Sequence, residues 1–388
     1  MFKQTIIAIS LFTSLIATQV DDFQKQKMQD FNNYKKSQKD AFNDYKEAQI
    51  KTFNDYKNEI GEIWQKPKLS TAKSWVSYSK DKRTRSDVDF SKEIIIIETI
   101  ALSQEEAKRN LQTALAKTVT TDTKSAHETD PLEIRLSKIN LPSGVADDKV
   151  DKQPILSTVI FEKKPTKQSI NKYVNKNITT DKITIKKSNK IKHANIYSIS
   201  IKLPPDTMIK RSKVYYDEVK LNANKRNLPL SLVFAVMHSE SSFNPRARSH
   251  IPAYGLMQIV PHSAGRDSYK FLYKKDKLVS GNYLYNSSNN IKMGSAYLHI
   301  LYYRYLKKIK NPDSRLYCTI AAYNTGAGNI AYAFTRTYNM NKATPLINAM
   351  SPKEVYNKLM KDLRFDEPKH YLKKVTSRMA GYHKVYGS

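Results

Sequence analysis

Residues 229–241 read PLSLVFAVMHSES, and they are the most informative stretch of the chain. A proline suits the first turn of a helix, and the residues after it are apolar nearly all round, which predicts a buried helix. Glu240 stands at its C-terminal end, where Phe243-Asn244-Pro245 stops the helix. A carboxyl there faces the negative end of the helix dipole and an apolar wall, and both raise its pKa. Such a group suits general-acid catalysis; the alternative is an ordinary glutamate in contact with water.

Three further segments place polar side chains in apolar or glycine-rich surroundings. Residues 255–261 read GLMQIVP, an apolar turn with one amide, and residues 367–371 read EPKHY, ahead of a last amphipathic helix. Residues 321–328 read AAYNTGAG, a helix of small residues that delivers Tyr323 and Asn324 to a glycine loop. Eight of the ten glycines lie between Gly255 and Gly387, which predicts the tight loops of a binding cleft.

In this order, these motifs resemble the family 1 lytic transglycosylases of bacterial peptidoglycan, whose SLT domain has a fold like that of goose-type lysozyme. The matching residues are Glu240-Ser241, Phe243-Asn244-Pro245, Ser249, Gly255-Leu256-Met257-Gln258, Ala322-Tyr323-Asn324, Gly326 and Tyr371. The N-terminal half is similar to the membrane-bound lytic murein transglycosylase C subfamily at Trp75-Val76, Tyr78, Thr84-Arg85-Ser86, Ile97-Glu98-Thr99-Ile100 and Ile196-Tyr197-Ser198. The resemblance spans residues 53–388.

The resemblance implies a chemistry centred on Glu240. This residue would protonate the β-1,4 oxygen between N-acetylmuramic acid and N-acetylglucosamine. As the carboxylate, it would then take the proton of the muramic C6 hydroxyl, which closes a 1,6-anhydro ring. The resemblance implies no cofactor. It also implies substrate-binding residues: Tyr323 and Tyr371 near Glu240, and Ser249, Met257, Gln258 and Asn324 along the sugar subsites. For Met257 and Asn324 the alternative is cleft architecture without a role in chemistry.

The distribution of acidic residues agrees with this chemistry. Lysozyme-type hydrolysis usually needs a second carboxylate about 5–10 Å from the acid. From Ser241 to Arg266 the chain has no Asp or Glu, and the next acid is Asp267. An internal hydroxyl nucleophile has a high effective concentration and needs no activated water. The local sequence therefore favours a transglycosylase over a hydrolase.

The chain as a whole is predicted to be α+β, with a mainly α catalytic domain. We expect a signal peptide at residues 1–20, a helical repeat segment at 21–66, a smaller α+β domain at 67–204 and the lysozyme-like domain at 205–388. Strands are predicted at residues 93–98, 155–161, 183–185 and 196–203 from their apolar runs, of which 196–201 alternates. Ser103 and Glu106 form the pattern of a capping box for a helix through Lys117.

An internal repeat follows the first 20 residues. Its units are Phe31-Asn32-Asn33-Tyr34-Lys35, Phe42-Asn43-Asp44-Tyr45-Lys46 and Phe53-Asn54-Asp55-Tyr56-Lys57, and Trp64 continues the register. A period of 11 corresponds to three helical turns, so the aromatic residues form one stripe. We favour a helix that packs on its own domain or self-associates. The alternative is a helix that docks on a membrane surface or an envelope protein.

Charge and the N-terminus indicate the compartment. The chain has 66 Lys+Arg and 36 Asp+Glu, a formal net charge of +30, which favours anionic partners such as nucleic acid, anionic lipid or another acidic polymer. After Lys3, the apolar stretch from Ile6 to Ala17 predicts a secretory signal; a buried helix and an uncleaved anchor are the alternatives. An exported chain does not meet DNA, so we expect the periplasm or cell envelope, with peptidoglycan strands as partner and no nucleic acid. The one cysteine, Cys318, does not follow the apolar stretch, so lipid attachment there is not expected.

Other classes of function find less support. His238, His250 and His262 lack the spacing of a zinc protease or deaminase, so no metal site is predicted, and Cys318 reads as a small core residue. The main alternative to the enzyme is a non-catalytic peptidoglycan-binding or scaffold protein that works through its repeat helix.

Overall fold

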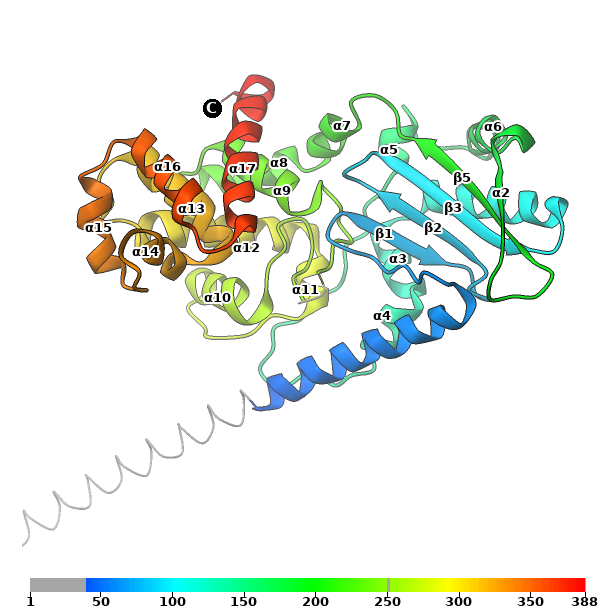
Figure 1. Cartoon of the computed structure of the whole chain (residues 1–388), viewed down its shortest axis with the longest axis horizontal. Helices are drawn as coiled ribbons and strands as arrows, with labels where there is room; N and C mark the ends of the chain where they lie inside the picture. Colours follow the sequence, from blue (N-terminus) through cyan, green and yellow to red (C-terminus); the bar gives the residue numbers. More distant parts are fainter. Residues whose placement is uncertain (1–39, 250–251, 388) are drawn as a thin grey trace, which may run out of the picture.

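The structure, a computed structural model, describes residues 40–249 and 252–387. The predicted signal peptide, the first aromatic repeat and His250 lie outside the described residues. Figure 1 shows an N-terminal half built around a sheet and a C-terminal half built of helices, which confirms the α+β class. The two halves meet near the middle of the long axis.

The N-terminal half begins with a helix over residues 40–63, followed by a five-stranded antiparallel sheet with helices on it. The sheet order is β1-β2-β3-β5-β4. The elements are β1 (Ser74–Tyr78), β2 (Thr84–Asp89), β3 (Ile94–Ala101), α2 (Gln104–Thr120), α3 (Thr123–Thr129), α4 (Pro131–Leu136), α5 (Ser157–Ile160), α6 (Lys167–Asn177), η1 (Thr180–Lys182), β4 (Thr184–Lys187) and β5 (Asn195–Lys202).

The sheet and α2 enclose the core of this half. Ile95 pairs with Ile201 and Ile97 with Ile199 across β3 and β5. These isoleucines pack against Leu111 of α2 because alternate residues of a strand point to the same face. The predicted strands at 93–98, 183–185 and 196–203 correspond to β3, β4 and β5, whereas β1 and β2 were not predicted. Ser103 caps α2 as expected, but the Glu106 carboxylate accepts from the Leu102 N–H at 3.0 Å rather than from that of Ser103.

The predicted strand at residues 155–161 is wrong, because the structure has the short helix α5 there. Val159 is the buried residue of α5, and Ile155 and Leu156, which precede the helix, are buried as well. Ile155 and Leu156 are neighbours in the chain and both are buried, whereas a strand with one buried face would alternate. The turn packs against α2 and α7 and has no neighbouring strand to pair with.

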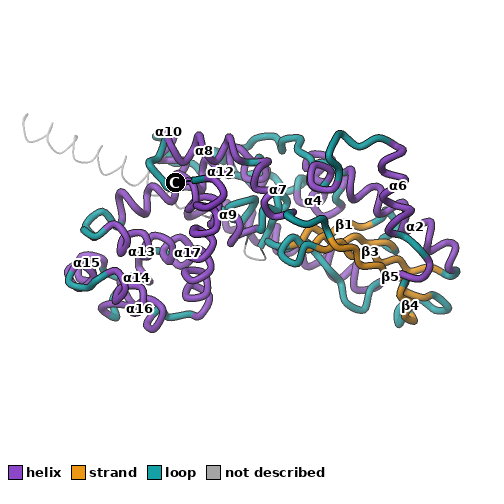
Figure 2. The backbone as a smooth tube through the Cα atoms, turned by 90° about the horizontal axis from the view of Figure 1, so that it is seen from above, coloured by secondary structure: helices purple, strands orange, loops and turns teal. Residues whose placement is uncertain are grey.

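The C-terminal half consists of helices joined by loops, and its described residues include no named strand (Figure 2). Its elements are α7 (Thr207–Val214), α8 (Tyr216–Asn224), α9 (Leu230–Ser241), η2 (Pro261–Gly265), α10 (Arg266–Tyr273), α11 (Gly281–Tyr285), α12 (Ser287–Ile300), η3 (Leu301–Tyr305), α13 (Pro312–Thr325), α14 (Ala327–Thr335), α15 (Met340–Asn348), α16 (Pro352–Asp362) and α17 (Asp366–Tyr386). The helix predicted from residues 229–241 is confirmed as α9, which lies against α8 and α17. None of the described helices is long and apolar enough to cross a membrane.

The aromatic stripe of the N-terminal helix faces the protein. Tyr56 and Trp64 are buried, and the Trp64 indole N–H donates to the Lys82 carbonyl at 2.7 Å. At the other end of the helix, the Phe42 ring lies 5.9 Å from that of His262 in the C-terminal half. The helix therefore packs on its own chain, as favoured from the repeat. Docking of this helix on a membrane surface or an envelope protein, the alternative, stays untested.

Two isoleucines of this helix provide a direct test of that packing. Ile60 is 0% exposed and Ile50 is 37% exposed. We expect Ile60→Ala to lower the free energy of unfolding by about 2–4 kcal/mol, because it leaves a cavity, and the matched control Ile50→Ala to lower it by less than about 1 kcal/mol. Urea unfolding followed by circular dichroism measures both. Equal effects of the two changes would contradict the packing described.

Candidate active site

Helix α9 carries Glu240 to the junction of the two halves. Its residues from Leu230 to Met237 are all buried, so the helix is fixed by contacts on every side. The helix ends where Ser242 takes a left-handed conformation (φ 52°) and donates its N–H to the His238 carbonyl at 3.1 Å. Glu240 lies in this last turn and is partly exposed. Its position at the C-terminal end of a buried helix is the one expected from the sequence.

The surroundings of Glu240 raise the pKa of its carboxyl to about 7. Burial is the largest cause, and the charge of Glu367 adds to it; the Tyr371 hydroxyl and the Lys73 ammonium act in the opposite direction. A carboxyl of this pKa is present in both forms near neutrality. It can therefore give up a proton and take one back within a single reaction cycle.

Two tyrosines close the site around this carboxyl. Tyr371 comes from α17, and its hydroxyl is buried, faces Glu240 and has no well-formed hydrogen bond to any described group. Tyr323, near the end of α13, donates its hydroxyl to the Met257 carbonyl at 2.8 Å. Burial and the nearby Glu240 charge raise the pKa of both phenols well above their usual value. Both tyrosines thus stay neutral hydrogen-bonding groups, and both lie where the sequence predicted.

The loop over residues 254–258 is held from below by Asn290, a residue of α12 that the sequence did not single out. Its amide accepts from the Met257 N–H at 2.8 Å and donates to the Tyr254 and Leu284 carbonyls, both at 2.8 Å. A Cβ at Gly255 would collide with this amide, and Gly255 has a φ of +73°, so the loop requires glycine. Ser241 of α9 ties the same loop to the Glu240 turn by donating to the Leu256 carbonyl at 2.7 Å.

Met257 and Gln258 have different places in this loop. The Met257 side chain is fully buried and its sulfur lies over Gly294, where there is no room for a Cβ. This position fits the alternative interpretation, cleft architecture, and the role of Met257 in substrate binding stays a prediction. Gln258 is partly exposed, has a φ of 47°, and donates its amide to the Gly255 carbonyl at 3.0 Å.

Ser249 and Asn324 are the remaining predicted site residues, and both are partly exposed. The Ser249 hydroxyl accepts from the Ala253 N–H at 3.0 Å, just ahead of the 254–258 loop. Asn324 donates its amide to the Glu367 carboxylate of α17 at 3.3 Å. The structure thus joins the glycine loop after α13 to the start of α17.

Glu367 is the second acid that the fold brings toward Glu240. It is exposed, and its charge raises the pKa of Glu240 less than burial does. Asp267, the next acid along the sequence after Glu240, instead accepts from the Tyr305 hydroxyl at 3.0 Å. Sequence spacing could not find Glu367, because it is 127 positions away in the chain and approaches only through the packing of α17 on α9.

The histidines and the cysteine take other roles. The His238 ring pairs with the Tyr382 hydroxyl at 3.1 Å, and burial together with the charges of Arg378 and Lys73 lowers the pKa of His238 to about 3. The His262 ring lies against that of Phe42 in a tilted arrangement, with an interplanar angle of 53°. Among residues 40–249 and 252–387, no three His, Cys, Asp or Glu side chains gather as a metal site would need. Cys318 is buried, and burial raises the pKa of its thiol to about 12, as fits a core residue.

Comparison with known proteins identifies relatives of both halves. Residues 218–345 match the transglycosylase SLT domain, and residues 42–214 match the N-terminal domain of membrane-bound lytic murein transglycosylase C. The membrane-bound lytic murein transglycosylase C of Salmonella arizonae is 34% identical over 329 residues, which cover 84% of this chain and 86% of the relative. That of Klebsiella pneumoniae has the same identity and coverage. Among solved structures, the 70-kDa soluble lytic transglycosylase of Escherichia coli aligns over 47% of this chain and 26% of its own, with a TM-score of 0.36 and 25% identity.

The raised pKa of Glu240 has a measurable effect on stability. A carboxyl whose pKa is higher in the folded than in the unfolded state stabilises the fold at low pH, and that contribution is lost as the pH rises. For Glu240 the loss falls between the ordinary value of 4.5 and about 7. We therefore expect the stability of Glu240→Gln, relative to the unsubstituted protein, to increase from pH 5 to pH 8. Thermal unfolding at several pH values measures this difference.

Asp276→Asn is the control for this measurement. Arg266 lowers the pKa of Asp276 below 3.8, so this group stays ionised in both states throughout the tested range. Its stability difference should be constant between pH 5 and pH 8. A constant difference for Glu240→Gln as well would show that its carboxyl is not desolvated.

Proposed function

This chain belongs to the membrane-bound lytic murein transglycosylase C family and is a peptidoglycan lytic transglycosylase, and from this premise we propose that Glu240 is its single acid and base. The observation that carries the proposal is the placement of the Glu240 carboxyl in the last turn of α9, facing Tyr371, Lys73 and Glu367, where its surroundings raise its pKa to about 7. In this mechanism the product is a 1,6-anhydromuropeptide. The reaction serves turnover and remodelling of the cell wall.

The proton follows a closed path through Glu240. The protonated carboxyl donates to the oxygen that leaves with N-acetylglucosamine, and the bond from that oxygen to C1 of N-acetylmuramic acid breaks. The carboxylate then accepts the proton of the muramic C6 hydroxyl, whose oxygen bonds to C1. No water is consumed, and Glu240 returns to its starting form. Because the attacking hydroxyl belongs to the substrate, its effective concentration replaces the activated water of a hydrolase.

The neighbouring residues support this proton transfer by holding the carboxyl, the loop and the glycan in place. The Tyr371 hydroxyl, which faces Glu240, donates to the carboxylate form after the first proton transfer. Tyr323 fixes the 254–258 loop through the Met257 carbonyl. The partly exposed side chains of Ser249, Gln258 and Asn324 offer a hydroxyl and two amides to the hydroxyl and N-acetyl groups of the glycan.

Digestion of purified sacculi tests the single-carboxylate mechanism. Glu240→Gln should release less than about one thousandth of the anhydromuropeptides of the unsubstituted enzyme, since the amide can neither donate nor accept the proton. Glu367→Gln should keep turnover within about tenfold, because the amide oxygen still accepts from Asn324 and no second carboxylate is required. For the unsubstituted enzyme, the rate should fall as the pH rises through about 7, the pKa of the required acid.

Mass spectrometry of the products distinguishes the alternatives. Anhydro ends agree with the mechanism. Reducing ends, together with an inactive Glu367→Gln variant, would indicate a hydrolase with two carboxylates. Binding without any product would indicate the scaffold alternative.

We further propose that the enzyme is exported and attached to the anionic face of an envelope membrane. The surface suited to this lies on α6, β4 and the adjoining turns, at the end of the molecule remote from α15 (Figures 1 and 2). Between residues 163 and 192 the chain has one acidic residue, Asp181, and ten exposed lysines: Lys163, Lys164, Lys167, Lys172, Lys176, Lys182, Lys186, Lys187, Lys190 and Lys192. Each lysine near an anionic lipid surface contributes about 1 kcal/mol. Attachment at this end leaves the site around Glu240 open to the glycan.

Vesicle co-sedimentation tests this attachment. The protein should bind phosphatidylglycerol-containing vesicles and not phosphatidylcholine vesicles, and salt should weaken the binding. The triple change K186E/K187E/K190E should reduce binding at least about tenfold, since it reverses three charges of the surface. The matched control K307E/K308E/K310E makes the same change of charge on exposed lysines of the C-terminal half. Equal loss in both variants would mean that only net charge matters and would contradict a defined surface.

A further inference from the structure

One lysine of the N-terminal half reaches the helix end that carries Glu240. Lys73 lies just before β1, and its ammonium group donates to the Ser239 carbonyl at 2.5 Å and to the His238 carbonyl at 3.3 Å. The Ser242 hydroxyl is a third neighbour, at 3.5 Å. The last carbonyls of a helix carry the negative end of its dipole, which favours a cation beside them. A cation from the N-terminal half therefore donates hydrogen bonds to the carbonyl groups of the turn that contains Glu240.

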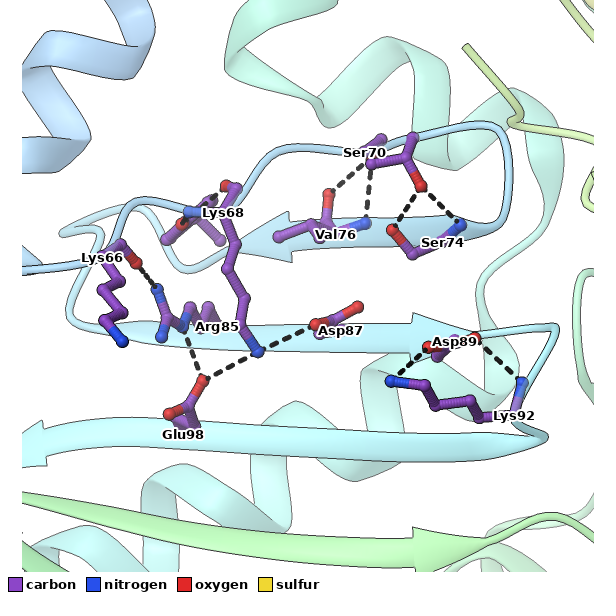
Figure 3. A network of polar contacts seen from close by, with 12 residues as sticks. Lys66, Lys68, Ser70, Ser74, Val76, Arg85, Asp87, Asp89, Lys92 and Glu98 are labelled. Atoms are coloured by element: carbon purple, nitrogen blue, oxygen red, sulfur yellow. Dashed lines mark hydrogen bonds and ion pairs between the residues drawn. The ribbon is translucent and has the colours of Figure 1, made fainter. Parts of the chain in front are cut away.

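The segment that carries Lys73 is itself fixed on the side of the sheet. Lys68 pairs with Asp87 at 2.9 Å and with Glu98 at 3.5 Å, and Arg85 pairs with the same Glu98 at 2.8 Å (Figure 3). The Ser70 hydroxyl accepts from the Val76 N–H at 2.9 Å. These contacts join residues 68–76 to β2 and β3. The ammonium group of Lys73 is thus presented from a rigid base.

The same segment is also fixed on the side of α9. The Asn244 amide, two residues past the end of the helix cap, lies 3.4 Å from the Thr71 carbonyl and 3.3 Å from the Ser74 carbonyl. The Arg248 N–H donates to the Thr71 carbonyl at 3.4 Å. Both sides of Lys73 are therefore attached to the chain that follows Glu240, so a shift of the sheet would move the Glu240 turn.

We propose that Lys73 is a positioning residue of the catalytic site, through which the N-terminal half holds the Glu240 turn and supplies a positive charge beside its carboxylate. This inference rests on the proposed function of Glu240. It makes the N-terminal half part of the catalytic unit, in addition to any part it has in attachment. Lys73 acts by holding the last turn of α9 and by its electrostatic effect on the Glu240 carboxylate. It does not need to touch the glycan.

The groups around the two residues determine how the charge acts. Glu240 is faced by Lys73, by Tyr323 of α13, and by Glu367 and Tyr371 of α17. Lys73 is faced by Arg378 and Lys374 of α17, by Glu240 and by Asp89 of β2. Burial and the charge of Arg378 lower the pKa of Lys73 to about 8, so it is cationic at pH 6 to 7. Arg378 itself donates to the Ser239 hydroxyl at 2.8 Å, and Lys73 is the partner from the N-terminal half.

The test compares full-length Lys73→Met and Lys73→Arg on purified sacculi over pH 5 to 9. Lys73→Met should lose about tenfold in turnover at pH 6, because the acid is less well positioned. It should also move the alkaline limb of the rate profile upward by about half a pH unit or more, because removal of a cation disfavours the carboxylate form. Lys73→Arg keeps the charge and the donors, so it should restore most of the turnover and leave the alkaline limb in place.

Controls separate this role from folding and from the mechanism itself. Lys80→Met makes the same change in an exposed turn between β1 and β2 and should match the unsubstituted enzyme. Thermal unfolding at pH 6 should show Lys73→Met folded. Unsubstituted turnover and an unmoved alkaline limb in Lys73→Met would overturn the proposal, as would equal loss in Lys73→Arg. Failure of the Glu240 mechanism would be seen separately, as activity of Glu240→Gln or as reducing-end products, in samples where Lys73 is unchanged.

Discussion

A carboxyl group is held at the C-terminal end of a buried helix, and the arrangement of the catalytic half depends on that placement. Burial disfavours the charged form of Glu240 and raises its pKa to about 7. Such a site is stable only if the helix cannot turn the carboxyl out toward water. The burial of α9 from Leu230 to Met237 provides this rigidity. The 254–258 loop, Tyr323 and Tyr371 are then assembled around a fixed point.

The two halves of the molecule are also joined by other contacts between them. Besides Lys73, a buried ion pair links Glu133 of α4 to Arg246 at 3.0 Å, and the Tyr285 hydroxyl donates to the same Glu133 at 3.0 Å. The segment after α4 also crosses the junction, where the Ala146 N–H donates to the Leu278 carbonyl at 2.8 Å. The spatial division of the chain is therefore less simple than a boundary at residue 204, because residues near 146 belong to the packing of the C-terminal half.

Local patterns predicted those elements whose burial follows a regular period. Helix α9 has apolar residues all round, and β5 alternates, so each had a clear signature. Residues 155–161 had only an apolar composition, which a strand and a short helix share, and tertiary packing selected the helix. Strands β1 and β2 contain several polar residues, and those of β2 pair with Lys68 and Glu98. Neither strand therefore has an apolar pattern from which it could be predicted. The aromatic repeat predicted a helix with an aromatic stripe along one side. Only the fold showed which surface of the protein that stripe packs against.

The sequence by itself determined the residue types of the candidate site: a glutamate at the end of an apolar helix, two tyrosines, and glycines where loops must turn. These residue types can be read from local propensity and from motifs that span only a few consecutive residues. Only the tertiary structure decided which distant groups approach Glu240, namely Lys73 from before β1 and Glu367 from α17, and that Asn290 supports the 254–258 loop. It also decided that Met257 lies beneath the loop. The physical reason is that desolvation, charge and buried hydrogen bonds depend on distance in space, and the packing of helices and sheet sets that distance between residues far apart in the chain.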